Sequence, residues 1–265
     1  MVNLAYVMAG SEATGGAGIQ ADLKTFQQLG VYGVGTLTCI VSFDPKASWG
    51  HRFVPVDPGV IADQFEAANA AHDLDVVKIG MLGTPATIEV AQRCLASKPW
   101  RHVVLDPVLI CKGQQPGAAL DTDTALRERI LPLADVITPN NFEAATLSGL
   151  EYPLATVDAL INAARAIHAL GTKNVVVKGG VDLPGPEAID ILFDGADITT
   201  YTSPKIGDER VSGAGCTFAA AITAELAKGA TVIHAVRVAK AMVDAGIRAR
   251  VSANTPFETV WQGAY

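Results

Sequence analysis

Charged residues and long apolar runs are both scarce in this sequence. Charged residues make up 18% of the 265 residues and hydrophobic residues 49%, a composition that can bury a large core and excludes a disordered chain. No apolar run continues long enough, without charges or helix breakers, to span a bilayer. The segment Met1–Gly10 has no basic region and predicts a strand, so we expect no signal peptide and a cytoplasmic location. A formal net charge of -7 makes nucleic acid an unfavourable partner.

Cysteine is rare, and several nucleotide and hydrolase signatures are missing. The cysteines Cys39, Cys94, Cys111 and Cys216 form no CxxC pair and fit no zinc-site spacing, so free thiols in a reducing compartment are expected. The P-loop pattern GxxxxGK[ST] is absent, which excludes that class of nucleotide enzyme. No GxGxxG follows a predicted strand, which weakens a dinucleotide-binding interpretation, and HExxH and GxSxG are also absent.

Short apolar runs alternate with helical patterns along the chain. Several runs are β-branched without polar alternation, as strands buried on both faces are. The predicted strands are Leu4–Met8, Val34–Val41, Val76–Ile79, Val103–Leu105, Val136–Ile137, Val175–Val177 and Ile189–Phe193. The predicted helices are Gln20–Leu29, Val60–Ala71, Thr87–Leu95, Thr124–Ile130, Phe142–Leu147, Val157–Leu170, Gly213–Ala227 and Val232–Arg250. This alternation predicts an α/β fold with a mostly parallel sheet, in which ligands bind at the carboxyl ends of the strands.

Nothing in the sequence marks a domain boundary. There is no Ser/Gly linker, internal repeat or low-complexity tract, so residues 1–265 are expected to form a single domain. The segments His51–Val56 and Lys112–Ala119 interrupt the alternating pattern. We expect them to form a small flap or lid.

A glycine-rich turn precedes the apolar helix near the C-terminus. Gly213, Ala214 and Gly215 are small, so the backbone N–H groups at the helix start can approach an anion, and the helix dipole adds positive charge there. An enzyme that transfers a phosphoryl group needs fixed donors of this kind. The alternative is a tight turn ahead of a buried helix.

Polar residues follow three of the predicted strands. Asp106 ends an apolar run, so its carboxylate is expected in the ligand crevice. Asn140 and Glu143 share one face of a starting helix, where they could hold Mg²⁺ near a triphosphate or form an N-cap and its capping box. Lys178 follows another buried run, where a lysine is usually a solvated strand end.

Six segments, in order, resemble the ribokinase superfamily and, more narrowly, its hydroxymethylpyrimidine kinase and pyridoxal kinase branch. They are Ala9–Thr25, Val77–Leu82, Asp106–Val108, Thr138–Asn140 with Glu143, Val177–Gly180 and Gly213–Phe218. The similarity runs from about residue 4 to about residue 250. It implies a ribokinase-like three-layer sandwich with a mostly parallel central sheet flanked by helices. It also implies an ATP-dependent kinase that uses Mg²⁺, acts on a small molecule and forms a homodimer.

The resemblance assigns roles to individual residues. Those implied to contact the nucleotide are Lys178, Gly180, Asn140, Ser203 and Lys205. Those implied to hold the metal are Asp106 and Glu143. Those implied to contact the substrate are Ser11, Asp22, Phe43, His51, Met81 and Val108. From the residues alone, Ser11 could be a helix cap and Asp22 an exposed helical residue. Met81 could be a core side chain and His51 a surface side chain.

One position separates the two substrate classes of this branch. Hydroxymethylpyrimidine kinases carry a glutamine near the position of Phe43, and a phenyl ring cannot donate and accept as an amide does. Asp44–Lys46 and Trp49–His51 instead look like the pyridoxal kinase relatives. We therefore expect phosphorylation of pyridoxal, pyridoxine or pyridoxamine, the B6 vitamers. A hydroxymethylpyrimidine or hydroxymethylpyrimidine-phosphate kinase remains the alternative, as does a non-catalytic ligand-binding protein on this fold.

Two cysteines are candidates for chemistry. Cys216 stands where most ribokinase-like enzymes have an aspartate base, and a helix N-terminus is expected to lower its thiol pKa so that it can take the substrate's hydroxyl proton. Cys111, beside Lys112, resembles the lid cysteine that adds to the pyridoxal aldehyde as a hemithioacetal. The alternative for Cys216 is a small residue at a helix start, and the alternative for Cys111 is a thiol buried in the core. Val211-Ser212 replaces the usual Thr-His, which puts nucleotide or monovalent-cation contacts in doubt.

Overall fold

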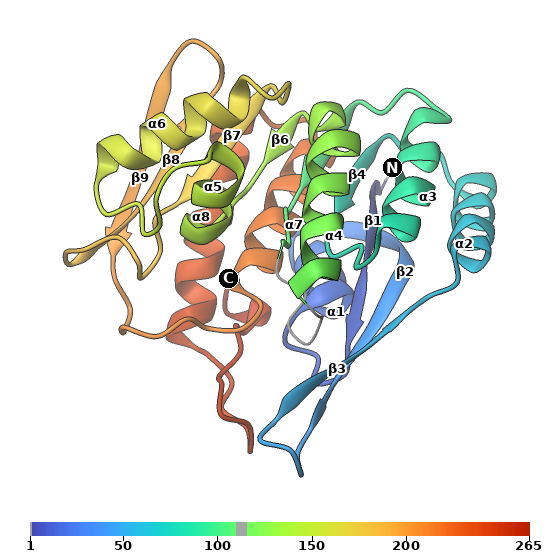
Figure 1. Ribbon diagram of the computed structural model, residues 1–265, viewed down its shortest axis with the longest axis horizontal. Coiled ribbons are helices and arrows are strands. Elements are labelled where there is room, and N and C mark those ends of the chain that lie inside the picture. The colour runs from blue at the N-terminus through green and yellow to red at the C-terminus, as the bar shows by residue number, and fades with distance from the viewer. Residues whose placement is uncertain (1, 110–115) are drawn as a thin grey trace.

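The computed structural model describes residues 2–109 and 116–265, with the side chains of 116–119 also left aside. Its strands form one sheet in the order β3-β2-β1-β4-β5-β6-β7-β8-β9 (Figure 1). The strands are β1 (Asn3–Glu12), β2 (Val31–Asp44), β3 (Gly50–Pro55), β4 (Val76–Ile79), β5 (His102–Leu105), β6 (Val136–Ile137), β7 (Asn174–Lys178), β8 (Glu187–Phe193) and β9 (Ile198–Pro204). From β2 to β7 all neighbours pair in parallel, whereas β3, β8 and β9 pair antiparallel at the two edges.

Helices cover both faces of the sheet and make it the middle of three layers. The helices are α1 (Gly18–Gln28), α2 (Pro58–Ala71), α3 (Pro85–Ala96), α4 (Pro116–Arg129), α5 (Asn141–Ser148), α6 (Val157–His168), α7 (Ala214–Ala227) and α8 (Val232–Arg248), with short 3-10 turns at Leu131–Leu133 and Gln262–Ala264. Buried side chains of α2 to α6 share one apolar core, and those of α1, α7 and α8 share another. Figure 1 shows the strands fanning between these two groups.

The parallel strands are buried because their residues are apolar on both faces. Along β1, Tyr6 and Met8 enter one core while Val7 and Ala9 enter the other, and all four are almost fully buried. Successive side chains along a strand point to opposite faces of the sheet. The uninterrupted apolar runs of the sequence therefore become the central strands of an α/β sandwich, and the expected fold class is confirmed.

Two strands were not predicted. β9 is a polar edge strand, Ile198–Pro204, in which threonines alternate with partly buried residues, so it lacks the apolar run on which the prediction relied. β3 was expected only as part of a flap. It pairs with the end of β2, and Figure 1 shows this β2–β3 hairpin projecting from the body of the sheet.

The second expected lid segment lies partly outside the described residues, and its remainder begins α4 at Pro116, earlier than predicted. No helix among the described residues has both the length and the apolar character needed to cross a membrane.

Candidate active site

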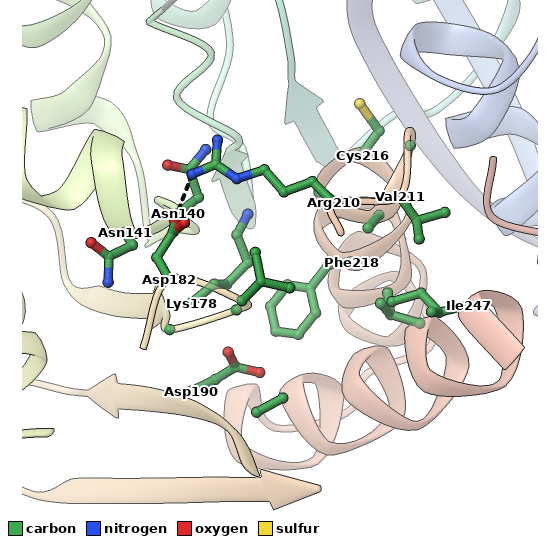
Figure 2. A pocket seen from close by; sticks show the side chains of 18 of the residues that line it. Asn140, Asn141, Lys178, Asp182, Asp190, Arg210, Val211, Cys216, Phe218 and Ile247 are labelled. Carbon is green, nitrogen blue, oxygen red and sulfur yellow. Dashed lines mark hydrogen bonds and ion pairs between the residues drawn. The ribbon is translucent and has the colours of Figure 1, made fainter. Parts of the chain in front are cut away.

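A cavity of about 370 Å³ opens at the carboxyl ends of β5, β6 and β7 and at the start of α7 (Figure 2). Asp106, Asn140 and Lys178, which end or follow these strands, line it together with the turn Gly213–Cys216. Parallel strands bring their carboxyl ends to one edge of a sheet, which is where such folds bind ligands. The expected crevice is therefore present, and the turn borders it.

The turn at the start of α7 has the backbone geometry of an anion site. Gly213 is the N-cap in the left-handed region, with φ of 80°, and no described side chain caps the helix. The N–H groups that open a helix lack intrahelical partners. That of Ala214 makes only a long hydrogen bond, 3.4 Å, to the Val211 carbonyl, so the helix start can still donate to a ligand. A Cβ atom on Gly213 would lie 1.8 Å from the carbonyl oxygen of Gly16. The turn thus packs against the glycine-rich segment that follows β1.

Glu12 organises that N-terminal segment, a role the sequence prediction missed. Its carboxylate accepts hydrogen bonds from the backbone N–H and hydroxyl of Thr14, at 2.6 and 2.7 Å, and from the N–H groups of Gly16 and Ala17, at 3.2 and 3.3 Å. A buried carboxylate that accepts several N–H bonds fixes the loop around it. An acidic residue directly before a glycine-rich run was the available signal.

Asp22 and Lys78 form a fully buried ion pair between α1 and β4, with 2.9 Å between Lys78 Nζ and Asp22 Oδ1. Burial raises the pKa of Asp22 to about 6 although Lys78 opposes the shift. Burial alone would lower the pKa of Lys78, but the carboxylates of Asp22 and Asp106 outweigh it and raise that pKa above its usual value. The alternative of an exposed helical Asp22 is therefore excluded.

The thiol of Cys216 lies in this charged cluster, beside the backbone N–H of Gly18. The expectation of a lowered pKa is wrong for the unliganded protein: burial raises the pKa of Cys216 to about 12, Lys78 and the Gly18 N–H lower it, and Asp106 and Asp22 raise it further. Desolvation of a thiolate outweighs the favourable helix terminus. The thiol is thus neutral at physiological pH when no ligand is bound.

Lys178 lines the cavity beside the turn Gly213–Cys216. Its Nζ lies 3.6 Å from Asp106 Oδ1 and 5.7 Å from the centre of the Phe218 ring. A Cβ atom on Gly215 would lie 3.6 Å from the same Nζ, so only a small residue leaves this approach open. The reading of Lys178 as a solvated strand end does not hold, because only 13% of its side chain is exposed.

Asn140 and Glu143 form a capping box at the start of α5. Asn140 Oδ1 accepts from the Glu143 N–H at 2.9 Å, and Glu143 Oε2 accepts from the Asn140 N–H at 2.8 Å. Both also line the cavity. Burial raises the pKa of Glu143 to about 8, with Lys178 and Asp106 acting in opposite directions. Asn140 and Glu143 therefore cap α5, as the sequence allowed. Their position at the cavity also lets them contact a ligand.

The residues expected at the substrate lie at the junction of β1, β2 and the hairpin. Ser11 Oγ accepts from Gln20 Nε2 at 2.7 Å, and the carbonyl oxygen of Met81 accepts from the Thr38 hydroxyl at 2.5 Å. Phe43 and His51 are cross-strand partners in the hairpin, with ring centres 4.6 Å apart. Phe257, which was not predicted, packs on the other side of Phe43, at 5.0 Å.

Four further assignments have different outcomes. Val108 and Gly180 line the cavity. Ser203 and Lys205 do not: Ser203 Oγ is buried without a hydrogen-bond partner among the described residues, and Lys205 Nζ donates to the carbonyl oxygens of residues 181 and 183. Lys205 therefore holds the turn after β7, and its contact with the nucleotide, like that of Ser203, stays a prediction. Cys111 lies outside the described residues, and its role stays a prediction.

The replaced Thr-His pair has a structural explanation. The Ser212 N–H donates to the Glu258 carbonyl at 2.9 Å, and its own carbonyl accepts from the Val260 N–H at 3.0 Å. Val211 lines the cavity. Position 212 therefore needs only its backbone to hold the turn against the C-terminal segment.

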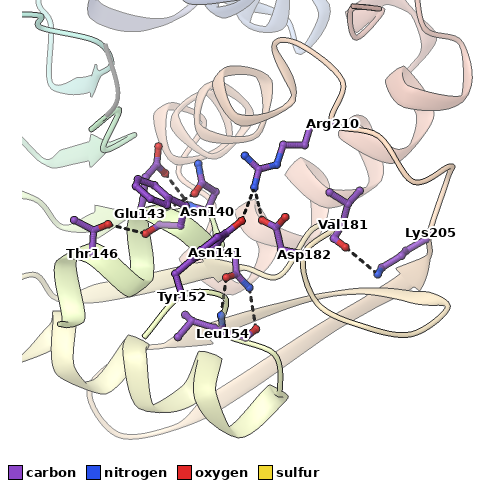
Figure 3. A network of polar contacts seen from close by, with 11 residues as sticks. Asn140, Asn141, Glu143, Thr146, Tyr152, Leu154, Val181, Asp182, Lys205 and Arg210 are labelled. Carbon is purple, nitrogen blue, oxygen red and sulfur yellow. Dashed lines mark hydrogen bonds and ion pairs between the residues drawn. The ribbon is translucent and has the colours of Figure 1, made fainter. Parts of the chain in front are cut away.

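Two ion pairs at the cavity wall were not predicted. Lys240, on α8, lies 2.9 Å from Asp190 Oδ2 and donates to the Ala188 carbonyl at 3.0 Å. Arg210 Nη2 lies 2.6 Å from Asp182 Oδ2 (Figure 3). These residues belong to no short motif, and only the folding of α8 and of the segment 205–213 against β7 and β8 brings them to one site.

The mostly parallel sheet between two helical layers, with an uncapped helix start beside a carboxylate and a lysine, is the arrangement that the resemblance to ribokinase-like kinases implied. The chain belongs to the phosphomethylpyrimidine kinase family, whose model matches residues 12–261.

Individual relatives agree with this family. A pyridoxine kinase of Bacillus subtilis is 47% identical over 244 residues, covering 92% of this chain and 90% of the relative. A structure of the Bacillus subtilis pyridoxal kinase in complex with ADP superposes with a TM-score of 0.94 at 44% identity, covering 100% and 98% of the two chains. The pyridoxal kinase of Staphylococcus aureus in complex with AMP-PCP and pyridoxal superposes with a TM-score of 0.92 at 38% identity, covering 100% and 95%.

Proposed function

We propose that this chain transfers the γ-phosphoryl group of ATP to the 5′-hydroxymethyl group of pyridoxal, pyridoxine or pyridoxamine. One observation carries the proposal: the turn Gly213–Cys216 borders the cavity on one side and contacts the N-terminal glycine-rich segment on the other. A phosphoryl-transfer site needs its donors where the two reactants meet, beside the phosphoryl group that passes between the attacking and leaving oxygens. The relatives in complex with ADP, AMP-PCP and pyridoxal support the same pairing of ligands.

The nucleotide is proposed to lie in the cavity with its phosphates toward the turn. Lys178 and the helix-start N–H groups supply positive potential there, while Phe218, Val243 and Ile247 offer apolar surface farther along the cavity. Such a division into a polar and an apolar end suits a nucleoside triphosphate.

Mg²⁺ is compatible with the residues at the phosphate end. The carboxylates of Asp106 and Glu143 both line the cavity, and one oxygen of Glu143 is not used in the capping box. Among the described residues no group of three or more His, Cys, Asp or Glu side chains is placed to hold a metal ion by itself. This favours an ion that Asp106 and Glu143 hold together with phosphate oxygens, because Mg²⁺ usually binds few carboxylates plus phosphates. Bound there, Mg²⁺ would neutralise part of the phosphate charge.

Cys216 is proposed to take the proton of the substrate hydroxyl. Its thiol is neutral in the unliganded protein, so proton transfer requires the charge around it to change when the ligands bind. Lys78 is the buried cation that favours the thiolate, and Asp22 holds Lys78 in place. The amides of Gly213 to Cys216 would then stabilise the phosphoryl group in flight.

The substrate preference rests on Phe43. It packs against His51 and Phe257 in an aromatic cluster, so an aromatic ring rather than an amide stands at this position. An aromatic wall suits a pyridine ring and gives no hydrogen bonds to an aminopyrimidine. The family model is named for phosphomethylpyrimidine kinase, which keeps that substrate as the alternative.

A homodimer in the cytoplasm is part of the proposal. The β2–β3 hairpin exposes Ile40 and Val54, which are cross-strand partners. Exposed apolar side chains grouped in this way favour an interface. The described cysteines, Cys39, Cys94 and Cys216, are free thiols, which suits a reducing compartment. Light scattering on the purified protein measures the oligomeric state directly.

The deciding experiment is a phosphorylation panel with ATP and Mg²⁺ across the three vitamers, hydroxymethylpyrimidine and its phosphate. We expect phosphorylated vitamers and ADP in equal amounts. Product from hydroxymethylpyrimidine with none from any vitamer would establish the alternative substrate. Failure of all five compounds to yield ADP, with retained binding of pyridoxal, would establish a ligand-binding protein instead.

A further inference from the structure

Arg210 is a cation at the cavity that the proposed reaction does not yet use. It lies in the segment 205–213, which connects β9 to α7, and it lines the cavity. Its Nη2 lies 2.6 Å from Asp182 Oδ2 and 3.4 Å from the hydroxyl of Tyr152. Figures 2 and 3 show its side chain reaching from the loop before α7 toward Asn140 and Asp182.

The arginine of the ion pair between Arg210 and Asp182 is exposed enough to exchange partners. The Arg210 side chain is 60% exposed and that of Asp182 18%, whereas those of Lys240 and Asp190 are 10% and 9% exposed. A pair with an exposed cation contributes less to the free energy of folding than a buried pair, so releasing Arg210 costs less than releasing Lys240. Releasing a buried pair leaves an uncompensated charge. Of these two cations, Arg210 is therefore the one that can move to a ligand.

Arg210 also lies close to the place proposed for the phosphates. Figure 3 shows its guanidinium near Asn140, and Asn140, Lys178 and Arg210 all line the cavity. A guanidinium presents several N–H donors in a planar fork that matches phosphate oxygens. Within the part of the chain that the structure describes, Arg210 donates its hydrogen bonds to Asp182 and Tyr152 through Nη2 alone. Its other two nitrogens are therefore available to a phosphate.

We propose that Arg210 is a phosphate-binding residue for the nucleotide, and that its guanidinium exchanges Asp182 for a phosphate oxygen of ATP or ADP. Asp182 then acts as a competing acceptor that holds the arginine while the cavity is empty of nucleotide. The exchange draws the segment 205–213 toward the bound phosphates. This inference rests on the proposed ATP-dependent reaction and adds to it a residue that no sequence motif identified.

The test is a set of binding titrations on the full chain with ADP, AMP and adenosine in the presence of Mg²⁺, by calorimetry. Arg210→Gln is expected to weaken ADP binding roughly 10-fold and to leave adenosine binding unchanged, because one charge-assisted phosphate contact is lost. Arg210→Lys should recover part of the affinity. The matched control is Arg93→Gln, which removes an exposed arginine paired with Glu89 on α3 at 2.8 Å, away from the cavity. Thermal unfolding of each variant confirms folding.

The direction in which Asp182→Asn changes the affinity for ADP decides between exchange and a purely structural ion pair. If Asp182 competes for Arg210, this variant should bind ADP about 3-fold or more tightly than the wild type, and that gain should vanish in the Arg210→Gln background. A gain that persists without Arg210 reflects only the loss of a negative charge and overturns the exchange. If both single variants weaken the binding of ADP and of adenosine equally, the ion pair only stabilises the structure, and the proposed exchange is overturned as well.

The two proposals fail separately, because ADP binding is measured without turnover. A wild-type protein that binds ADP but phosphorylates none of the five test compounds contradicts the proposed function alone. A wild-type protein that phosphorylates pyridoxal, with an Arg210→Gln variant that binds ADP as the wild type does, contradicts the phosphate-binding role of Arg210 alone.

Discussion

Gly213, at the start of α7, rests on the carbonyl oxygen of Gly16, so closely that a Cβ atom would lie 1.8 Å from that oxygen. The two residues come from opposite ends of the sequence, and their contact places the helix-start N–H groups beside the segment that Glu12 organises. The proposed nucleotide and substrate regions meet at this contact. The predictions below test the groups that surround it.

Gly213→Ala is expected to lower kcat at least about 100-fold, because the turn must shift away from Gly16 and phosphoryl-transfer sites lose about this much when their donors are misplaced. Its φ of 80° adds backbone strain. Gly229→Ala is the matched control: its φ of 89° is equally unfavourable, but a Cβ atom there meets no described atom within 4 Å. Steady-state kinetics and thermal unfolding of both variants separate the contact from the strain. Similar kcat values in the two variants would contradict the prediction.

Cys216→Ala should reduce kcat by roughly 10²- to 10⁴-fold, the usual contribution of a general base. Because burial places the Cys216 pKa of the unliganded protein at about 12, the thiolate fraction rises with pH, and wild-type kcat/KM should increase toward alkaline pH. Cys216→Asp, which supplies a carboxylate that ionises at lower pH, should retain activity and lose this alkaline rise. Cys94→Ala, in the core on the other face of the sheet, is the control for loss of a buried thiol. If the activity of Cys216→Asp depends on pH as that of the wild type does, Cys216 is not the base.

Glu143→Gln should lower kcat and raise the free energy of unfolding at alkaline pH. The carboxyl pKa of Glu143 is raised from 4.5 to about 8, so the free energy of unfolding contributed by this group is full below pH 4.5 and is lost as pH rises through 8. The glutamine amide can accept the same hydrogen bond from the Asn140 N–H without a charge. The variant should therefore gain on the order of 2–4 kcal/mol over the wild type at pH 9 and almost nothing at pH 4, while kcat with ATP and Mg²⁺ falls.

Denaturant unfolding at a series of pH values measures this difference. Asp182→Asn, which removes a less buried carboxylate from the same cavity, is the control for the loss of a carboxylate. A constant difference between Glu143→Gln and the wild type across this pH range would contradict the prediction.

Lys78→Met should destabilise the protein by about 3–5 kcal/mol, because it leaves the buried Asp22 carboxylate without its counter-charge. Combining it with Asp22→Leu should restore most of the lost stability, since an apolar pair replaces a buried ion pair at little net cost. The double variant should still fail to phosphorylate pyridoxal, because both the cation beside Cys216 and the proposed substrate contact are gone. Urea unfolding and turnover together test this, and a double variant as active as the wild type would show that the pair is structural only.

Much of the fold followed from local patterns. The apolar β-branched runs at Val76–Ile79 and Val175–Val177 became central strands, because residues apolar on both faces fit only between two helical layers. The capping box of Asn140 and Glu143 is equally local, since its two hydrogen bonds span three residues. The polar edge strand β9 was missed because its stability comes from pairing with β8 rather than from its own side chains.

The candidate site was only partly predictable. Glycine spacing and resemblance placed Asp106, Lys178 and the turn Gly213–Cys216 correctly at one cavity. The same reasoning put Ser203 and Lys205 at the nucleotide, whereas Lys205 is held by carbonyl groups of the turn after β7. Arg210 and Asp182 were missed, because nothing in either segment shows that the two meet.

The sequence by itself determined the sandwich, the order of its strands along the chain and the residue types available for phosphoryl transfer, because periodicity and helix-start glycines are properties of short segments. Only the tertiary structure decided the protonation of Cys216, the charge of the Asp22–Lys78 pair and the partner of Arg210. These depend on desolvation and on charges brought together from distant segments, and neither is encoded within a window of a few residues.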